Sequence, residues 1–310
     1  MKTAFLFPGQ GSQKVGMVQD LFENYDSVKA LIKEADETLG FPISKMMFEG
    51  PDTELMKTEF TQPAILTASV AVWQVLKEHG LTPDIAAGHS LGEYSALVAA
   101  GAISFADAVN TVHLRGRFMQ EAVPLGEGGM AAVIGSTPET IVKVCAEVST
   151  EDLPVQAVNF NCPGQVVIAG APAAVEKACE ALKEAGARRA IMLKVSAPFH
   201  STLMEPAALR LKEVLDKIDI HDTAIPVVAN VNAKEETKAD EIRKNLVDQA
   251  AHPVHWEESI RNMVAGGVDM TVACIYCGFY GIFCDFIRHF PCAEAYARYF
   301  YAVSEYIFVL

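Results

Sequence analysis

The pentapeptide Gly-His-Ser-Leu-Gly at residues 88–92 constrains this chain more than any other feature. It follows the apolar run 85–87, which predicts a buried strand, and precedes residues 93–100, which predict a helix. A Gly-x-Ser-x-Gly sequence in this setting is typical of a nucleophile elbow, a sharp turn that holds the hydroxyl of Ser90 clear of the backbone. The backbone N–H of Leu91 then faces the position where an oxyanion forms. An ordinary tight turn is the alternative interpretation.

Composition and charge limit the class of protein. Of the 310 residues, 51% are hydrophobic, which is enough for one large domain or for a large domain with a smaller one. The net charge of −14 excludes a general nucleic-acid binder, because such a protein needs a basic face. The longest uncharged apolar run, 270–284, is shorter than a membrane span. Seven irregularly spaced cysteines predict reduced thiols, so we expect a cytoplasmic protein that does not enter a membrane.

Apolar periodicity and turn signals predict an α/β protein with a parallel sheet. The expected strands are 3–7, the segment at 85–87, and 226–229; the expected helices are 17–39, 62–79, 93–100, 104–123, 201–215, 239–249 and 254–265. In between, a β-α-β-β-α-β order is predicted at 130–134, 138–148, 155–159, 165–169, 172–185 and 190–195. That order is typical of a ferredoxin-like unit. We therefore expect a large domain of residues 1–125 and 197–270, an inserted subdomain of 126–196, and an atypical tail of 271–310.

Arg115 lies within the apolar stripe of the predicted helix 104–123, whereas Arg117 points elsewhere. A guanidinium on the side that faces the core must meet a carboxylate or a phosphate, because burying it unpaired is costly. Spacing alone favours an internal ion pair with an Asp or Glu. A bound anionic ligand is the alternative.

A serine nucleophile needs a base, and the chain has eight histidines. His89 adjoins Ser90 in an extended segment, so its side chain is expected to project to the other side. His200 lies in a proline-containing turn at the junction of the inserted unit and the following helix, where a cleft usually forms. Taken by itself, the position of His200 favours a structural histidine over a catalytic one. No histidine has partners at metal-ligand spacing.

Five ordered segments resemble the malonyl-CoA:acyl-carrier-protein transacylase family. They read Phe-Pro-Gly-Gln-Gly-Ser-Gln at 7–13, Gly-His-Ser-Leu-Gly-Glu-Tyr at 88–94, Arg-Gly-Arg-Phe-Met at 115–119, Asn-Cys-Pro-Gly-Gln at 161–165 and Ala-Pro-Phe-His-Ser at 197–201. The resemblance runs from residue 1 to about 269, and the joint occurrence of five motifs in order is specific. It implies a hydrolase-like α/β domain with a ferredoxin-like insert and an active site between them.

The resemblance also implies a mechanism. Ser90 would attack the thioester of malonyl-CoA with His200 as general base, and the backbone carbonyl of Gln249 would orient that histidine in place of an acidic residue. We hypothesise that this weaker orienting dipole makes His200 a poor base toward water. The malonyl-serine would then survive until a thiol arrives.

The remaining roles follow from the same resemblance. The backbone N–H groups of Gln10 and Leu91 would form the oxyanion hole, and Arg115 would hold the malonyl carboxylate as a bidentate pair. The acceptor would be the phosphopantetheine thiol of acyl carrier protein, in a ping-pong reaction of fatty acid biosynthesis without a cofactor. A free-standing polyketide acyltransferase is the nearest alternative. A serine esterase or lipase is more distant.

The tail departs from the family pattern. Residues 271–310 hold four of the seven cysteines and half of the 24 Phe and Tyr residues. Cys274 and Cys277 form a C-x-x-C pair, but no second such pair follows, so we predict no metal site. Basic residues for docking the carrier protein are expected at 188, 189 and 194.

Overall fold

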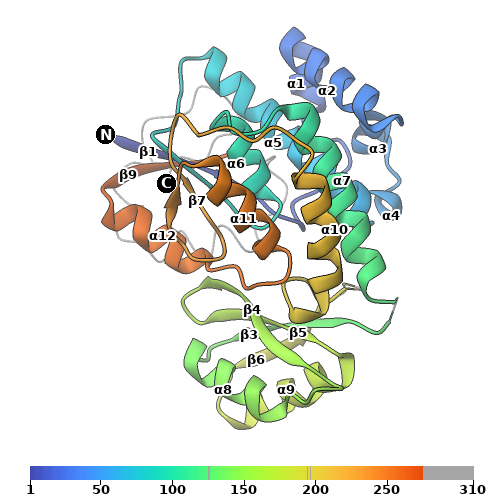
Figure 1. Cartoon of the computed structure of the whole chain (residues 1–310), viewed down its shortest axis with the longest axis vertical. Coiled ribbons are helices and arrows are strands. Elements are labelled where there is room, and N and C mark those ends of the chain that lie inside the picture. Colours follow the sequence, from blue (N-terminus) through green and yellow to red (C-terminus); the bar gives the residue numbers. More distant parts are fainter. Residues whose placement is uncertain (125, 194, 196, 275–310) are drawn as a thin grey trace.

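The described part of the chain contains two β-sheets, a five-stranded one and a four-stranded one (Figure 1). The computed structural model describes residues 1–124, 126–193, 195 and 197–274. The larger part contains β1 (Lys2–Phe7), α1 (Gln19–Asn24), α2 (Asp26–Leu39), α3 (Ile43–Glu49), α4 (Asp52–Leu55), α5 (Thr58–Glu78), β2 (Ile85–Gly88), α6 (Gly92–Ala99), α7 (Phe105–Ala122), the short 3-10 helix η1 (Thr202–Met204), α10 (Glu205–Leu215), β7 (Val227–Val228), β8 (Glu235–Glu236), α11 (Ala239–Gln249), α12 (Trp256–Ala265) and β9 (Val268–Ala273). The smaller part contains β3 (Gly129–Ile134), α8 (Pro138–Val148), β4 (Val155–Cys162), β5 (Gln165–Gly170), α9 (Pro172–Glu184) and β6 (Arg189–Met192).

The larger sheet has the strand order β8-β7-β2-β1-β9. Its three pairings from β7 to β9 run parallel, and β8 pairs with β7 antiparallel. Alternate residues of β1 face two different layers. Phe5 and Phe7 pack toward α5, α6 and α7, whereas Ala4 and Leu6 pack toward α12. Because both faces of the sheet are covered by helices, its strands are continuous apolar runs.

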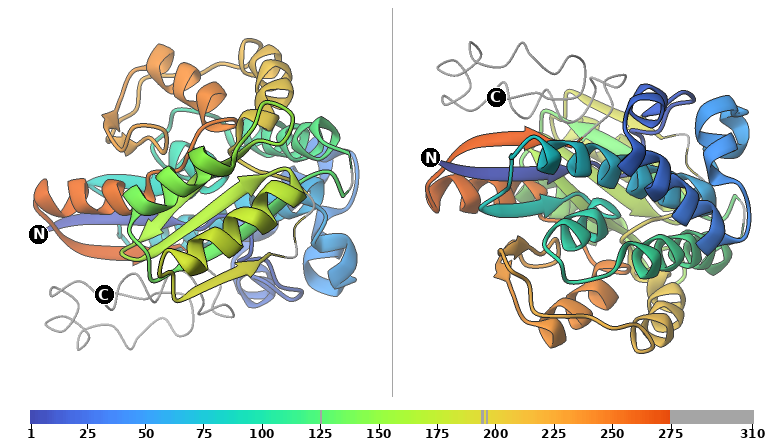
Figure 2. Two further views of the ribbon diagram at one scale, coloured as in Figure 1. Left: turned by 90° about the horizontal axis from the view of Figure 1, so that it is seen from below. Right: turned by 90° about the horizontal axis from the view of Figure 1, so that it is seen from above.

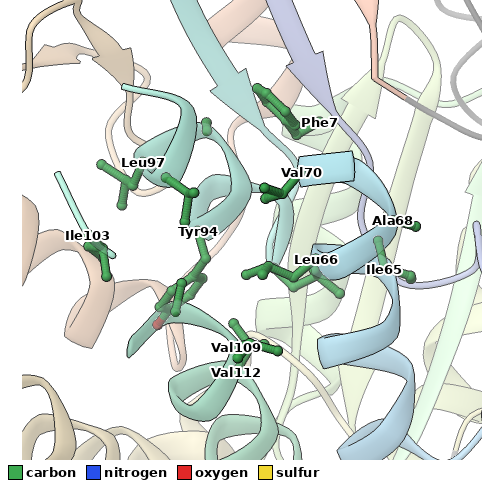
Figure 3. Packing of buried hydrophobic residues seen from close by; sticks show 14 of the residues in the cluster. Phe7, Ile65, Leu66, Ala68, Val70, Tyr94, Leu97, Ile103, Val109 and Val112 are labelled. Atoms are coloured by element: carbon green, nitrogen blue, oxygen red, sulfur yellow. The ribbon is translucent and has the colours of Figure 1, made fainter. Parts of the chain in front are cut away.

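The main core lies on the α5–α7 side of the larger sheet. Figure 3 shows Phe7, Leu66, Val70 and Tyr94 converging there from β1, α5 and α6. Each fully buried apolar side chain of this size contributes about 1.5–3 kcal/mol relative to exposure. This packing fixes the carboxyl ends of β1 and β2, where the chain turns toward the candidate site.

The smaller sheet is antiparallel with the order β4-β5-β3-β6, and α8 and α9 cover one face (Figure 2). This is the ferredoxin-like arrangement, so the predicted fold class is confirmed. Backbone bonds connect the sheet to the larger part: Phe160 N–H donates to Val254 O (2.9 Å) and Val254 N–H donates to Val158 O (2.8 Å).

Three predicted helix boundaries were wrong. The expected helix 17–39 is interrupted at Tyr25, which is extended (φ −124°). The helix expected at 62 begins at Thr58 instead, and the Glu59 carbonyl that Pro63 leaves without a donor accepts from His113 Nδ1 (2.9 Å). The helix expected from 254 begins at Trp256, because Val254 is bonded to β4.

The larger sheet extends past the expected domain boundary at residue 270. Strand β9 pairs in parallel with β1 through Ala273, and Val272 packs in the main core. Residues 271–273 therefore belong to this sheet rather than to a separate tail. Residues 275–310, including Cys277 and most of the predicted tail, lie outside the described residues. Among the described helices, none has the length and apolarity that crossing a membrane requires.

Candidate active site

Ser90 lies at the sharp turn between β2 and α6, with a left-handed backbone conformation (φ 53°). The two flanking glycines are required by close packing. A β-carbon at Gly88 would overlap the backbone of Gly92, and one at Gly92 would overlap the carbonyl of Phe7. Such a strained turn persists only where surrounding structure enforces it, and it exposes the hydroxyl at the end of the strand.

His200 is the partner of this hydroxyl, 110 residues further along the chain. Ser90 Oγ lies 2.8 Å from His200 Nε2, and His200 Nδ1 lies 2.8 Å from the backbone oxygen of Gln249. Because a carbonyl only accepts, Nδ1 carries the proton and Nε2 is free to accept one from the serine. Burial, followed by the charge of Arg115, lowers the pKa of His200 to about 3. The imidazole is therefore neutral at pH 7 and can act as a base.

Arg115 reaches the same hydroxyl from α7 and is 1% exposed. Its guanidinium donates to Gln62 Oε1 (2.8 Å), to Gln249 Oε1 (2.8 Å) and to Ser90 Oγ (3.2 Å). The ion pairs of the described arginines involve Arg117, Arg210 and Arg261, and none involves Arg115. The ion pair that spacing alone favoured was therefore the wrong interpretation.

A buried guanidinium whose hydrogen-bond acceptors are all neutral oxygens keeps its full positive charge and can bind an anion. Charge-assisted bonds to a carboxylate are about twice as strong as neutral ones, and a guanidinium matches two carboxylate oxygens at once. The Nε of Arg115 has no partner among the described residues. The guanidinium thus offers an anion site within 3.2 Å of the Ser90 hydroxyl.

Gln10 and Leu91 flank the serine from two loops. Gly9 approaches so closely that a β-carbon there would lie 2.6 Å from His89 O, which brings the loop after β1 against the elbow. The Leu91 side chain is buried in the core, so only its backbone is available to the site. Within the described chain, neither the Gln10 nor the Leu91 backbone N–H donates a hydrogen bond.

A cavity of about 200 Å³ is lined by residues of both the larger part and the smaller sheet. Ser90, His200 and Arg115 are among its lining residues, and most of its surface is apolar. The lining residues are Pro8, Gly9, Gln10, Gly11, Ser12, Gln62, His89, Ser90, Arg115, Met119, Met130, Asn159, Asn161, Val167, Leu193, Val195, Phe199, His200 and Trp256. A mostly apolar cavity with a few polar groups suits an acyl group or a thiol-bearing arm.

Asn230, which follows β7, also contacts the elbow and was not predicted from the sequence. Its Oδ1 accepts from Ser90 N–H (2.6 Å), and its Nδ2 donates to Gly88 O (2.7 Å). One amide side chain therefore binds the backbone of the elbow at two positions. The available signal was its place directly after a short buried strand, at the carboxyl edge of a parallel sheet. His89 Nε2 lies 2.9 Å from Asn161 Oδ1, which confirms that His89 points away from the Ser90 hydroxyl. In the described part of the chain, no cluster of three His, Cys, Asp or Glu could hold a metal.

Comparison with known proteins supplies the family. The family model for the acyl transferase domain matches residues 4–275. Malonyl CoA-acyl carrier protein transacylase of Bacillus subtilis is 55% identical over 267 residues, covering 86% of this chain and 84% of that protein. The chain belongs to the malonyl-CoA:acyl-carrier-protein transacylase family. The resemblance stated from five motifs is thus confirmed.

Solved structures of malonyl-CoA:acyl-carrier-protein transacylases share the fold. An acyl carrier protein S-malonyltransferase from Vibrio cholerae superposes with a TM-score of 0.86 at 48% identity, covering 89% of this chain and 90% of that one. A malonyl-transacylase in complex with a type II polyketide synthase acyl-carrier protein superposes with a TM-score of 0.88 at 46% identity, covering 92% of each chain.

Proposed function

We propose that this enzyme transfers the malonyl group of malonyl-CoA to the phosphopantetheine thiol of acyl carrier protein, in fatty acid biosynthesis. One observation carries the proposal. The hydroxyl of Ser90 lies 2.8 Å from a neutral His200 and 3.2 Å from Arg115, a buried cation without a carboxylate partner among the described residues. This combination supports nucleophilic attack on an acyl group that carries its own negative charge.

In the first half-reaction, Ser90 Oγ attacks the thioester carbon as His200 Nε2 takes the hydroxyl proton. The negative charge on the carbonyl oxygen is stabilised by the backbone N–H groups of Gln10 and Leu91. Collapse of this intermediate breaks the C–S bond, and the proton on His200 passes to the sulfur of coenzyme A. The product is a malonyl ester of Ser90.

In the second half-reaction, the thiol of the carrier protein occupies the place that coenzyme A has left. His200 takes the thiol proton, and the thiolate attacks the ester carbonyl carbon. The bond from that carbon to Ser90 Oγ then breaks, and His200 returns the proton to the serine oxygen. Because the two thiols use the site in turn, the kinetics are ping-pong. The reaction needs no cofactor, since malonyl-CoA is a substrate and each proton is returned.

The orientation of His200 supports a preference for thiols over water. Its Nδ1–H donates to the carbonyl of Gln249 and not to a carboxylate, which distinguishes the site from the triads of esterases. A carbonyl dipole stabilises an imidazolium less than a full charge does. We expect the malonyl-serine to hydrolyse slowly when no carrier protein is present.

The direct test supplies malonyl-CoA together with either a fatty acid carrier protein or a polyketide carrier protein in its phosphopantetheine form. The expected result is faster formation of the malonylated fatty acid carrier, followed by mass spectrometry. A preference for the polyketide carrier would favour the alternative function, a free-standing polyketide acyltransferase. A malonyl-transacylase of similar structure forms a complex with such a carrier. Release of free malonate without transfer would favour an esterase.

The proposal includes a cytoplasmic location and a basic docking surface for the acidic carrier. The described cysteines at 145, 162, 179 and 274 are free thiols, which suits a reducing compartment. Arg188 and Arg189 are exposed at the start of β6, on the smaller part of the molecule. Lys194, the third predicted docking residue, lies outside the described residues.

A further inference from the structure

Glu93 is a fully buried carboxylate one residue into α6, and it does not touch the cavity. Its Oε2 accepts two hydrogen bonds, from the backbone N–H of Asn230 (2.8 Å) and from the side-chain amide of Gln249 (3.1 Å). Burying a carboxylate is costly unless it is bonded, so its retention here requires an explanation. The two residues it binds are the ones that hold the reacting groups.

One chain of hydrogen bonds runs from Glu93 through Asn230 to the turn at Ser90. The Asn230 backbone is held by Glu93, and its side chain accepts from Ser90 N–H (2.6 Å) and donates to Gly88 O (2.7 Å). Ser90 is in the left-handed region, which is unfavourable for a residue with a β-carbon. Bonds on both sides of the turn therefore maintain the conformation that aims the hydroxyl.

A second chain of hydrogen bonds runs from Glu93 to Arg115 and His200 through Gln249. Its Nε2 donates to Glu93 Oε2 and to Ser90 O (2.9 Å), so two acceptors fix which way the amide faces. Its Oε1 is consequently turned to Arg115 (2.8 Å), and its backbone oxygen accepts from His200 Nδ1 (2.8 Å). If the amide turned over, its NH₂ would face the guanidinium, and both groups are donors.

We propose that Glu93 is a positioning residue of this enzyme, whose carboxylate oxygen sets both the strained Ser90 turn and the Gln249 amide that orients Arg115. The inference rests on the proposed function. Both incoming groups are N–H donors, so the requirement is for an acceptor oxygen at this distance and not for a negative charge. Burial and the neighbouring Glu236 carboxylate raise the pKa of Glu93, which agrees with a role that does not depend on its charge.

Two substitutions separate reach from charge. Glu93→Gln keeps an acceptor oxygen at the same length and removes the ionisable group, whereas Glu93→Asp keeps the carboxyl group and withdraws its oxygens by one methylene. We expect Glu93→Gln to form malonyl-serine at close to the wild-type rate. We expect Glu93→Asp to lose about a hundredfold in kcat/KM for malonyl-CoA, the cost typical of an ångström-scale misplacement.

The ratio of malonyl to acetyl transfer is a measurement that a general loss of stability does not change. Acetyl-CoA carries no carboxylate for Arg115, so in Glu93→Asp the ratio of malonyl to acetyl transfer is expected to fall by about tenfold. Glu236 offers a matched control, because it is also buried but bonds to Asn245 Nδ2 (2.6 Å) rather than to a site residue. Glu236→Asp is expected to lower the melting temperature and to leave the malonyl-to-acetyl ratio unchanged.

Quenched-flow intact-mass measurements of serine acylation, with melting temperatures for each variant, decide the matter. The inference is overturned if Glu93→Asp keeps the wild-type rate and ratio, or if it is more active than Glu93→Gln. It is also overturned if Glu236→Asp changes the ratio as strongly as Glu93→Asp does. Failure of the wild-type enzyme to become malonylated would instead refute the proposed function, so the two failures are distinguishable.

Discussion

Replacement of Arg115 by alanine is the most informative perturbation of substrate selection. The guanidinium is 1% exposed, and its hydrogen-bond acceptors are all neutral: the side chains of Gln62 and Gln249 and, at 3.2 Å, the Ser90 hydroxyl. A carboxylate bound there receives two charge-assisted hydrogen bonds, each contributing about 1.5–3 kcal/mol. Their loss amounts to about 4 kcal/mol, or about a thousandfold in kcat/KM for malonyl-CoA.

Acetyl-CoA provides the internal comparison, because its methyl group makes neither bond. We expect Arg115→Ala to transfer acetyl groups at least as well as the wild type, so the malonyl-to-acetyl preference falls by about the same thousandfold. Rates of acyl-serine formation from each thioester measure this directly. Equal losses for the two substrates, or no loss for either, would refute the role assigned to Arg115.

Arg117→Ala is the matched control on the same helix. Arg117 is about half exposed and lies 3.7 Å from Glu121, a surface pair worth less than about 1 kcal/mol. It is expected to leave both substrates unaffected. Melting temperatures of the two variants show how far Arg115→Ala is also destabilised, since it leaves the oxygens of Gln62 and Gln249 without a donor.

Further predictions concern the base and the elbow. Formation of malonyl-serine should keep its rate from neutral pH down toward the lowered His200 pKa of about 3, and a rate that halves near 6.5 would contradict this. The same lowered pKa makes the free energy of unfolding decrease as pH falls from 6.5 toward 3, because His200 binds a proton in the unfolded chain but not in the folded one. Urea titrations at several pH values should find that the free energy of unfolding depends less on pH in His200→Gln. Gly92→Ala should cost about 3 kcal/mol of stability through overlap with the Phe7 carbonyl, whereas Gly266→Ala, which meets only a 3.3 Å contact, should cost much less in the same denaturation experiment.

The local parts of this site could be predicted from the sequence. The elbow at Ser90 is specified within a few residues by two glycines, a buried strand and a helix, and the order of elements in the smaller sheet follows from apolar periodicity. Helix boundaries were harder where tertiary contacts decide them. Val254 bonds to β4, and the Glu59 carbonyl is satisfied by His113 from another helix.

The long-range parts depended on the family resemblance or were missed. Nothing near Arg115 in the sequence tells whether its partner is a carboxylate or an amide, because its acceptors come from α5 and α11. The same limit applies to Asn230 and Glu93, which are joined across 137 residues. Polar residues whose partners lie far along the chain carry no periodic signal, so only the folded arrangement identifies them.

Intact-mass spectrometry after exposure to malonyl-CoA, without carrier protein, tests the central claim most directly. The account predicts a gain of one malonyl group, located by peptide mapping on Ser90 and removed when the carrier thiol is added. The matched Ser90→Ala protein should gain nothing. No adduct on the wild type, or an adduct that persists in Ser90→Ala, would contradict the account.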